Sequence, residues 1–162
     1  MIPSLIGRFP PQAVFAELVG DEVRTVTSSE LFKVQRAVVI GVPGAFTPVC
    51  TQKHLPDFVA QAPRLVASGI DLIACVTPND PWVNAAWSKQ IDPRGKIRML
   101  SDGNLDFCRA LGLTGSAREW NLGERSRRYL MQLRGGRIDR ISVERSILEV
   151  ACTRPADLTV DV

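Results

Sequence analysis

The chain of 162 residues lacks several features on which whole classes of protein depend. It has a single histidine, His54, and four widely separated cysteines, Cys50, Cys75, Cys108 and Cys152. It therefore contains no C-x-x-C pair and no dense disulfide framework, and a zinc site built from histidine and cysteine is unfavourable. We expect no metal and no cofactor. We therefore expect the four cysteines either to carry out thiol chemistry or to be buried in the core.

The sequence also lacks a long apolar run and a strong charge. No window approaches the roughly 18 apolar residues of a membrane span, and the first residues do not form a basic region followed by an apolar stretch. A formal net charge of only +3, from 20 basic and 17 acidic residues, disfavours nucleic acid or a membrane as the principal partner. We expect a soluble, cytoplasmic protein. Its 45% hydrophobic and 23% charged residues fit one globular domain over residues 1–162.

Two continuous apolar runs, residues 37–42 and 70–76, are typical of strands buried on both faces. Between them, apolar residues recur at three- and four-residue steps from Leu55 onward, which predicts a helix. Pro56 and Pro63 predict a kink or break in that helix. Together these segments predict a βαβ unit with parallel strands.

The second half of the chain adds shorter elements. Asp80 and Pro81 provide the cap and first turn of a helix. The remaining patterns predict a strand at 97–100, a helix at 105–111, a hairpin of 129–133 with 138–143, and a short helix near Pro155. This order indicates an α/β protein with a thioredoxin-like fold, in which helices flank a central mixed β-sheet.

The nine residues Val-Pro-Gly-Ala-Phe-Thr-Pro-Val-Cys end at Cys50, just after the first predicted strand. If a helix begins here, Thr47 is its N-cap, Pro48 its first residue and Cys50 lies in its first turn. The peptide dipoles and free N–H groups of a helix start favour an anion, and therefore the reactive thiolate form of cysteine. The alternative is that Cys50 is only a small buried hydrophobe. The stiff loop and the nearby Thr47 hydroxyl favour an activated thiol.

The segment from Gly41 to Cys50, followed by His54-Leu-Pro56, resembles the active-site loop of type-5 peroxiredoxins, which are thiol peroxidases. Further matches cover most of the chain: Asn79-Asp80, Trp87, Leu100-Ser-Asp102, Ala110-Leu-Gly-Leu113 and the segment from Gly123 to Tyr129. The resemblance implies the peroxiredoxin fold, an antioxidant role and a homodimer packed beside the active-site loop.

By this resemblance Pro43, Thr47, Cys50 and Arg128 occupy the catalytic positions. The Cys50 thiolate would attack the peroxide, while Thr47 and Arg128 hydrogen-bond the peroxide oxygens and Pro43 shields the sulfur from water. The product on sulfur is a sulfenic acid, which has to be reduced before it is oxidised further.

The resemblance does not decide which thiol reduces the sulfenic acid on Cys50. Some type-5 relatives carry a resolving cysteine where Cys152 lies, although the segment around it lacks their glycine-rich loop. Cys75 matches a position proposed for plant-type relatives, but a strand cysteine is more simply a buried core thiol. The alternative is a one-cysteine cycle in which glutathione with a glutaredoxin, or thioredoxin directly, reduces Cys50.

Three functions are therefore compared. The favoured one is an enzyme that reduces hydrogen peroxide and small organic hydroperoxides through Cys50. The second is a redox-sensing regulatory or binding protein in which Cys50 oxidation alters a partner interface without fast turnover. The third, a thioredoxin-like disulfide oxidoreductase, is disfavoured because Thr47 and Lys53 occupy the places where a C-x-x-C partner would lie.

Overall fold

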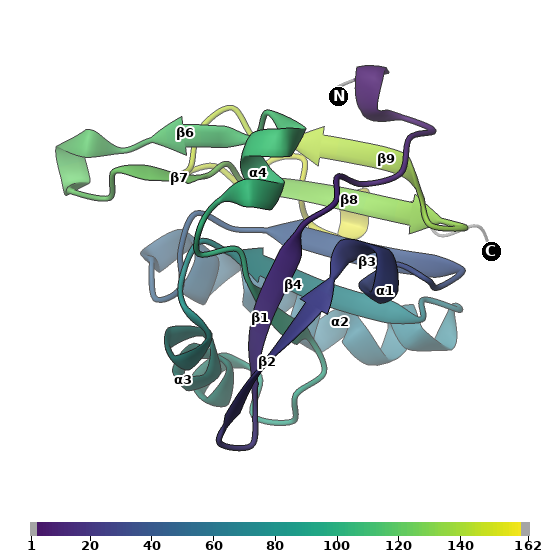
Figure 1. Cartoon of the computed structure of the whole chain (residues 1–162), viewed down its shortest axis with the longest axis horizontal. Helices are drawn as coiled ribbons and strands as arrows, with labels where there is room; N and C mark the ends of the chain where they lie inside the picture. The colour runs from purple at the N-terminus through teal and green to yellow at the C-terminus, as the bar shows by residue number, and fades with distance from the viewer. Residues whose placement is uncertain (1–2, 160–162) are drawn as a thin grey trace.

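The structure, a computed structural model, describes residues 3–159 and is built on a seven-stranded mixed sheet (Figure 1). The strand order is β2-β1-β5-β4-β3-β8-β9. In chain order these strands are β1 (Val14–Val19), β2 (Glu22–Thr27), β3 (Arg36–Gly41), β4 (Leu72–Thr77), β5 (Arg98–Ser101), β8 (Tyr129–Arg134) and β9 (Arg137–Val143). A separate two-stranded sheet pairs β6 (Thr114–Ser116) with β7 (Glu124–Ser126).

The helical elements lie between the strands. The α-helices are α1 (Ser28–Leu31), α2 (Leu55–Ala67), α3 (Pro81–Ile91) and α4 (Asp106–Leu111). A π-helical turn, Cys50–His54, directly precedes α2. Single 3-10 turns are formed by Pro3–Leu5, Arg118–Trp120 and Pro155–Asp157.

The central strands bury both faces of the sheet. β3 pairs in parallel with β4 and antiparallel with β8, which makes the sheet mixed. Because successive side chains of a strand point to opposite faces, Val38 packs with residues of α2 and α3, and Val39 with residues of α1 and α4. The predicted buried strands, the βαβ unit and the mixed α/β sheet are confirmed.

The predicted break of the helix at the prolines is wrong. The helix runs without interruption through Pro56 and Pro63 to Ala67. Pro56 directly follows the π turn, where the hydrogen bonding of the helix is already widened, and Pro63 is on the exposed side of the helix, where water can reach the carbonyl that loses its partner. The irregularity is instead the π turn, in which the Leu55 N–H donates to the carbonyl oxygen of Cys50.

The hairpin of β1 and β2 was not anticipated from the sequence. Phe15 of β1 is fully buried, the other residues of the two strands are partly buried or exposed, and Gly20 adopts a positive φ of 62° in the turn between them. This strand pair occupies the edge of the sheet beyond β5.

Gly41, the last residue of β3, lies directly opposite Tyr129 of β8. A Cβ atom at position 41 would overlap the Tyr129 ring, so only glycine allows this close approach. The chain leaves the sheet here and enters the loop that carries Pro43 and Thr47. The strand pairing thus determines where the loop begins.

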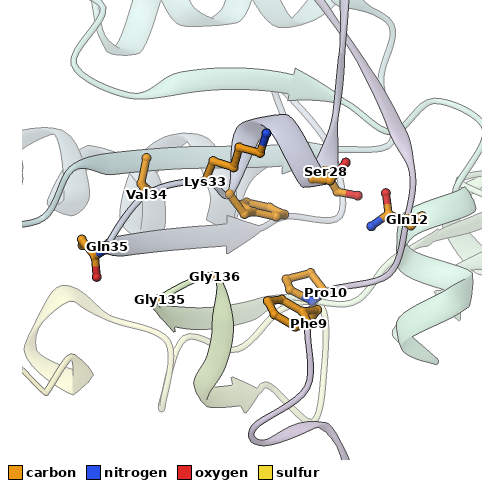
Figure 2. A pocket seen from close by; sticks show the side chains of 11 residues that line it. Phe9, Pro10, Gln12, Ser28, Lys33, Val34, Gln35, Gly135 and Gly136 are labelled. Carbon is orange, nitrogen blue, oxygen red and sulfur yellow. The ribbon is translucent and has the colours of Figure 1, made fainter.

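A cavity of about 530 Å³ lies between the N-terminal segment, the region of α1 and the β8–β9 turn (Figure 2). Phe9 and Pro10 line one side of it, with Lys33 and Val34 opposite. None of the predicted site residues lines this cavity. Within residues 3–159, no helix is long and apolar enough to cross a membrane.

Candidate active site

The loop after β3 turns directly into a helix. The helical region begins at Pro48, so Cys50 lies in its first turn, as the sequence predicted. The first helical hydrogen bond runs from the Thr51 N–H to the Thr47 carbonyl oxygen at 3.0 Å. Asn79, which follows β4, fixes the loop: its Oδ1 accepts a hydrogen bond from the Ala45 N–H at 2.8 Å. Cys50 is fully buried at this helix start.

Thr47 and Pro43 flank the start of the helix. Thr47 occupies the predicted N-cap position, but its hydroxyl acts as a donor, to the Gly44 carbonyl oxygen at 2.8 Å. Since that hydrogen is already used, the lone pairs of Oγ1 are left to accept a hydrogen bond. Pro43 is buried within the loop.

Arg128 reaches the sulfur from the connection between β7 and β8. Its side chain is only 1% exposed, and Nη1 donates to the Cys50 Sγ at 3.2 Å across 78 residues of sequence. Nη2 donates to the Ile147 carbonyl oxygen at 2.9 Å, whereas the buried Nε has no partner among the residues described. The structure therefore brings together the cysteine and the arginine that the resemblance selected.

His54 is a site residue that the sequence analysis did not select. It lies at the end of the π turn, four residues after Cys50, and is 1% exposed. Its Nδ1 is 2.9 Å from Nη1 of Arg128, and its Nε2 is 2.7 Å from the Thr153 carbonyl oxygen. Burial, followed by the positive charge of Arg128, lowers the pKa of His54 to about 4. Its four-residue spacing from Cys50 was the available signal, because residues four apart share a helix face.

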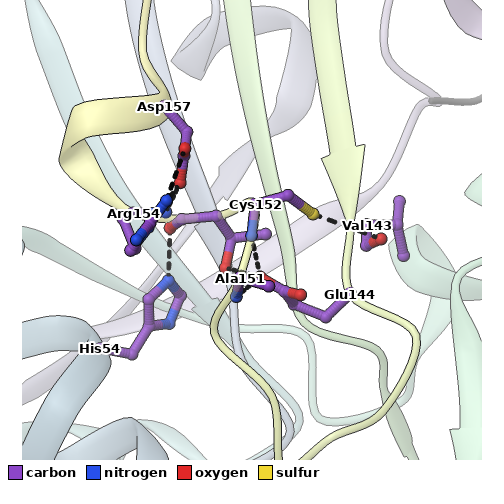
Figure 3. A network of polar contacts seen from close by, with 8 residues as sticks. His54, Val143, Glu144, Ala151, Cys152, Arg154 and Asp157 are labelled. Atoms are coloured by element: carbon purple, nitrogen blue, oxygen red, sulfur yellow. Dashed lines mark hydrogen bonds and ion pairs between the residues drawn. The ribbon is translucent and has the colours of Figure 1, made fainter.

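Cys152 lies in the C-terminal segment, which Glu144 holds in place (Figure 3). Oε1 of Glu144 accepts hydrogen bonds at 2.8 Å from the Ala151 N–H, the Cys152 N–H and the Thr153 hydroxyl. Burial raises the pKa of this carboxyl group, but the hydrogen bonds outweigh that effect and lower it overall. The anchored segment places Thr153 against His54.

The Cys152 thiol is free and partly buried, and its Sγ lies 3.7 Å from the Val143 carbonyl oxygen. Figure 3 shows this side chain pointing toward Val143, away from His54. Burial and the negative charge of Glu144 raise the pKa of the Cys152 thiol. The structure therefore does not place Cys152 against the sulfur of Cys50 in its present arrangement.

The two remaining cysteines are core residues. Cys75 is fully buried in β4 and Cys108 in α4, both as free thiols. Burial raises the pKa of Cys75 well above its ordinary value and that of Cys108 to about 12. Both groups stay protonated at neutral pH. Among residues 3–159, no three histidine, cysteine, aspartate or glutamate side chains gather so that they could hold a metal ion.

Comparison with known proteins supplies the family. The Redoxin family matches residues 8–154. A chloroplastic peroxiredoxin of Oryza sativa, Peroxiredoxin-2E-2, is 44% identical over 126 residues, which cover 76% of this chain and 56% of that protein. The chain spans about half the length of the chloroplastic relatives it matches. Peroxiredoxin-2D of Arabidopsis thaliana is 32% identical over 145 residues, and 90% of its length is covered.

Solved structures agree with the sequence relatives. Reduced Prx3 from Vibrio vulnificus, in complex with hydrogen peroxide, superposes with a TM-score of 0.87 at 34% identity over 94% of each chain. Peroxiredoxin 5 from Alvinella pompejana superposes with a TM-score of 0.78 at 33% identity, over 88% of this chain and 90% of that chain. These superpositions confirm the predicted thioredoxin-like fold. The chain belongs to the peroxiredoxin family and is of the type-5 kind that its Cys50 loop resembles.

Proposed function

We propose that this protein is a thiol peroxidase that reduces hydrogen peroxide and small organic hydroperoxides through Cys50. The observation that carries the proposal is the 3.2 Å hydrogen bond from the buried Arg128 guanidinium to the Cys50 sulfur. A guanidinium and a helix start both stabilise negative charge on that sulfur. The hydrogen peroxide complex of the related Prx3 supports the choice of substrate.

The chemistry begins with attack of the Cys50 thiolate on the terminal oxygen of the peroxide. An S–O bond forms while the O–O bond breaks, so the sulfur is oxidised to a sulfenic acid and the leaving oxygen takes up a proton to become water or an alcohol. The Thr47 lone pairs accept the peroxide O–H, while Arg128 donates to the oxygens as negative charge moves onto them. The Nε–H of Arg128, buried without a partner among the described residues, is a donor that a peroxide oxygen would satisfy. Pro43 keeps water from the sulfur.

The sulfenic acid is reduced by a second thiol, which releases water and forms a disulfide. In the two-cysteine route that thiol is Cys152, and thioredoxin then reduces the Cys50–Cys152 disulfide. The Cys152 thiol points toward Val143 and its segment is bonded to Glu144, so this route requires the thiol to turn toward Cys50. In the one-cysteine route, glutathione with a glutaredoxin or thioredoxin itself supplies the thiol.

A homodimer packed beside the active-site loop is part of the proposal. Three aromatic side chains, Phe46, Trp82 and Trp120, are exposed by 48%, 60% and 51%. The loop that carries Phe46 is bonded to Asn79, shortly before Trp82, and Arg125 of β7 lies beside the same loop. Exposed aromatic side chains of this kind favour association with a second copy. A Trp82→Glu variant that stays dimeric in analytical ultracentrifugation would contradict this interface.

A coupled assay tests the peroxidase function. Hydrogen peroxide consumption is followed with thioredoxin and its reductase, and in parallel with glutathione, glutaredoxin and glutathione reductase. We expect turnover that Cys50→Ser abolishes and that Arg128→Met lowers at least about 100-fold. Arg140→Met, an exposed arginine on β9, is the matched control and should retain the wild-type rate. Oxidation of Cys50 by peroxide without turnover in either system would favour the redox sensor instead.

The cytoplasmic location and the single-domain organisation over residues 1–162 stay predictions. Fractionation of cells followed by detection of the protein tests the first, and limited proteolysis of the full chain tests the second.

A further inference from the structure

Arg128 is oriented by groups that do not neutralise it. Within residues 3–159, the ion pairs do not include its guanidinium, although the side chain is almost fully buried. Its nitrogens donate instead to the Cys50 sulfur, to His54 and to the Ile147 carbonyl oxygen. Within the part of the chain that the structure describes, none of these partners is a carboxylate, so no ion pair offsets the positive charge that Arg128 directs at the Cys50 sulfur.

The hydrogen bonds determine which form of His54 is present. The Thr153 carbonyl oxygen can only accept, so Nε2 carries the ring proton and donates it. Nδ1 is then the bare nitrogen and accepts a hydrogen bond from Nη1 of Arg128. A second proton on the ring would direct an N–H group at the guanidinium. The charged groups that act on the ring are Arg128 and Glu144, and the imidazole is neutral at physiological pH.

The Nε2 side of the His54 imidazole is also fixed by its neighbours. Glu144 accepts hydrogen bonds from the Thr153 hydroxyl and from the two preceding main-chain N–H groups. These bonds hold the Thr153 carbonyl oxygen in place as the acceptor for Nε2 of His54. The ring edge packs against Phe58 of α2, with 5.5 Å between ring centroids. A hydrogen-bonded path thus runs from the Cys50 sulfur through Arg128 and His54 to the segment that carries Cys152.

We propose that His54 is a positioning residue of the peroxidase site: its neutral imidazole holds the Arg128 guanidinium against the Cys50 sulfur without competing for its charge. The inference rests on the proposed function for its role in turnover. A carboxylate in the same place would hold Arg128 equally well but would neutralise it. An aliphatic side chain would take from Nη1 of Arg128 one of its two acceptors and from the Thr153 carbonyl oxygen its donor.

Three variants of nearly equal size separate these effects. His54→Asn keeps a neutral acceptor where Nδ1 lies, His54→Asp adds a negative charge at that point, and His54→Leu removes the acceptor. The readout is the pH dependence of Cys50 alkylation by iodoacetamide, measured on the Cys50 peptide by mass spectrometry. We expect the midpoint to rise by about one pH unit in the Asp and Leu variants and by clearly less in the Asn variant. The peroxide rate constant should fall about tenfold for Asp and Leu and about twofold for Asn.

Circular dichroism and thermal unfolding establish which variants are folded, and the comparison of Asn with Asp stands even if the Leu variant does not fold. Equal midpoints in wild type, Asn and Asp would overturn the positioning role and leave His54 as a packing residue. Alkylation does not require peroxide. A wild-type protein that fails to turn over peroxide would therefore overturn the proposed function, whereas unchanged midpoints in an active enzyme would overturn only this inference.

Discussion

The acid stability of the protein should depend strongly on His54. Its pKa is about 4 in the folded protein, against 6.5 for an ordinary histidine. Between these values the unfolded chain binds a proton that the folded protein does not bind, so the free energy of unfolding falls as the pH falls from about 6.5 toward 4 and levels off below it. From pH 7.5 to 4.5 this single group removes about 2.5 kcal/mol of stability.

Urea unfolding of the wild type and of His54→Asn at pH 7.5, 6.0 and 4.5, followed by tryptophan fluorescence, measures this contribution. Glu144 and the other carboxyl groups titrate in both proteins, so their effects cancel in the difference. The variant should lose about 2.5 kcal/mol less than the wild type over this range. Parallel losses, within about 0.5 kcal/mol of each other, would refute a neutral, buried His54.

Three other predictions follow from the geometry. Gly41→Ala should destabilise the fold by about 2 kcal/mol or more in thermal unfolding, because the new Cβ overlaps the Tyr129 ring. An unchanged melting temperature would show that β3 and β8 can separate there without cost. Glu144→Ala should raise the rate of hydrogen exchange at the Ala151 and Cys152 amides at least about tenfold, since both lose their acceptor. Unchanged protection would mean that other contacts hold the segment that carries Cys152. Cys152→Ser should stop thioredoxin-coupled turnover if the two-cysteine route operates, and unchanged turnover would assign reduction to an external thiol.

The parts of the fold that depend on local patterns were predictable. The continuous apolar run of β3 specifies a strand buried on both faces, and proline and threonine before Cys50 specify a helix start. The helix through Pro56 and Pro63 was not predictable in the same way. Whether a proline breaks a helix depends on whether it follows a π turn or lies on the exposed side, and both are set by tertiary packing.

The placement of the candidate site residues was predictable where residues are close in sequence or match a family motif, as at Thr47, Cys50 and Arg128. The contact of His54 with Arg128 spans 74 residues and its contact with Thr153 spans 99. Both contacts form only because β8 and the C-terminal segment pack against the π turn. A lone histidine in sequence therefore carried no sign of its partners. The three donors to Glu144 follow it closely in sequence, but they lie in a segment without helix or strand, so no periodic pattern predicted them.

The role of Cys50 is tested by oxidising the reduced protein with sub-stoichiometric hydrogen peroxide, blocking the free thiols and mapping the products by non-reducing peptide mass spectrometry. We expect Cys50 to be oxidised first, as a sulfenic acid or in a disulfide with Cys152, while Cys75 and Cys108 stay reduced. An unmodified Cys50 beside oxidised thiols elsewhere in the chain would contradict the peroxidase mechanism.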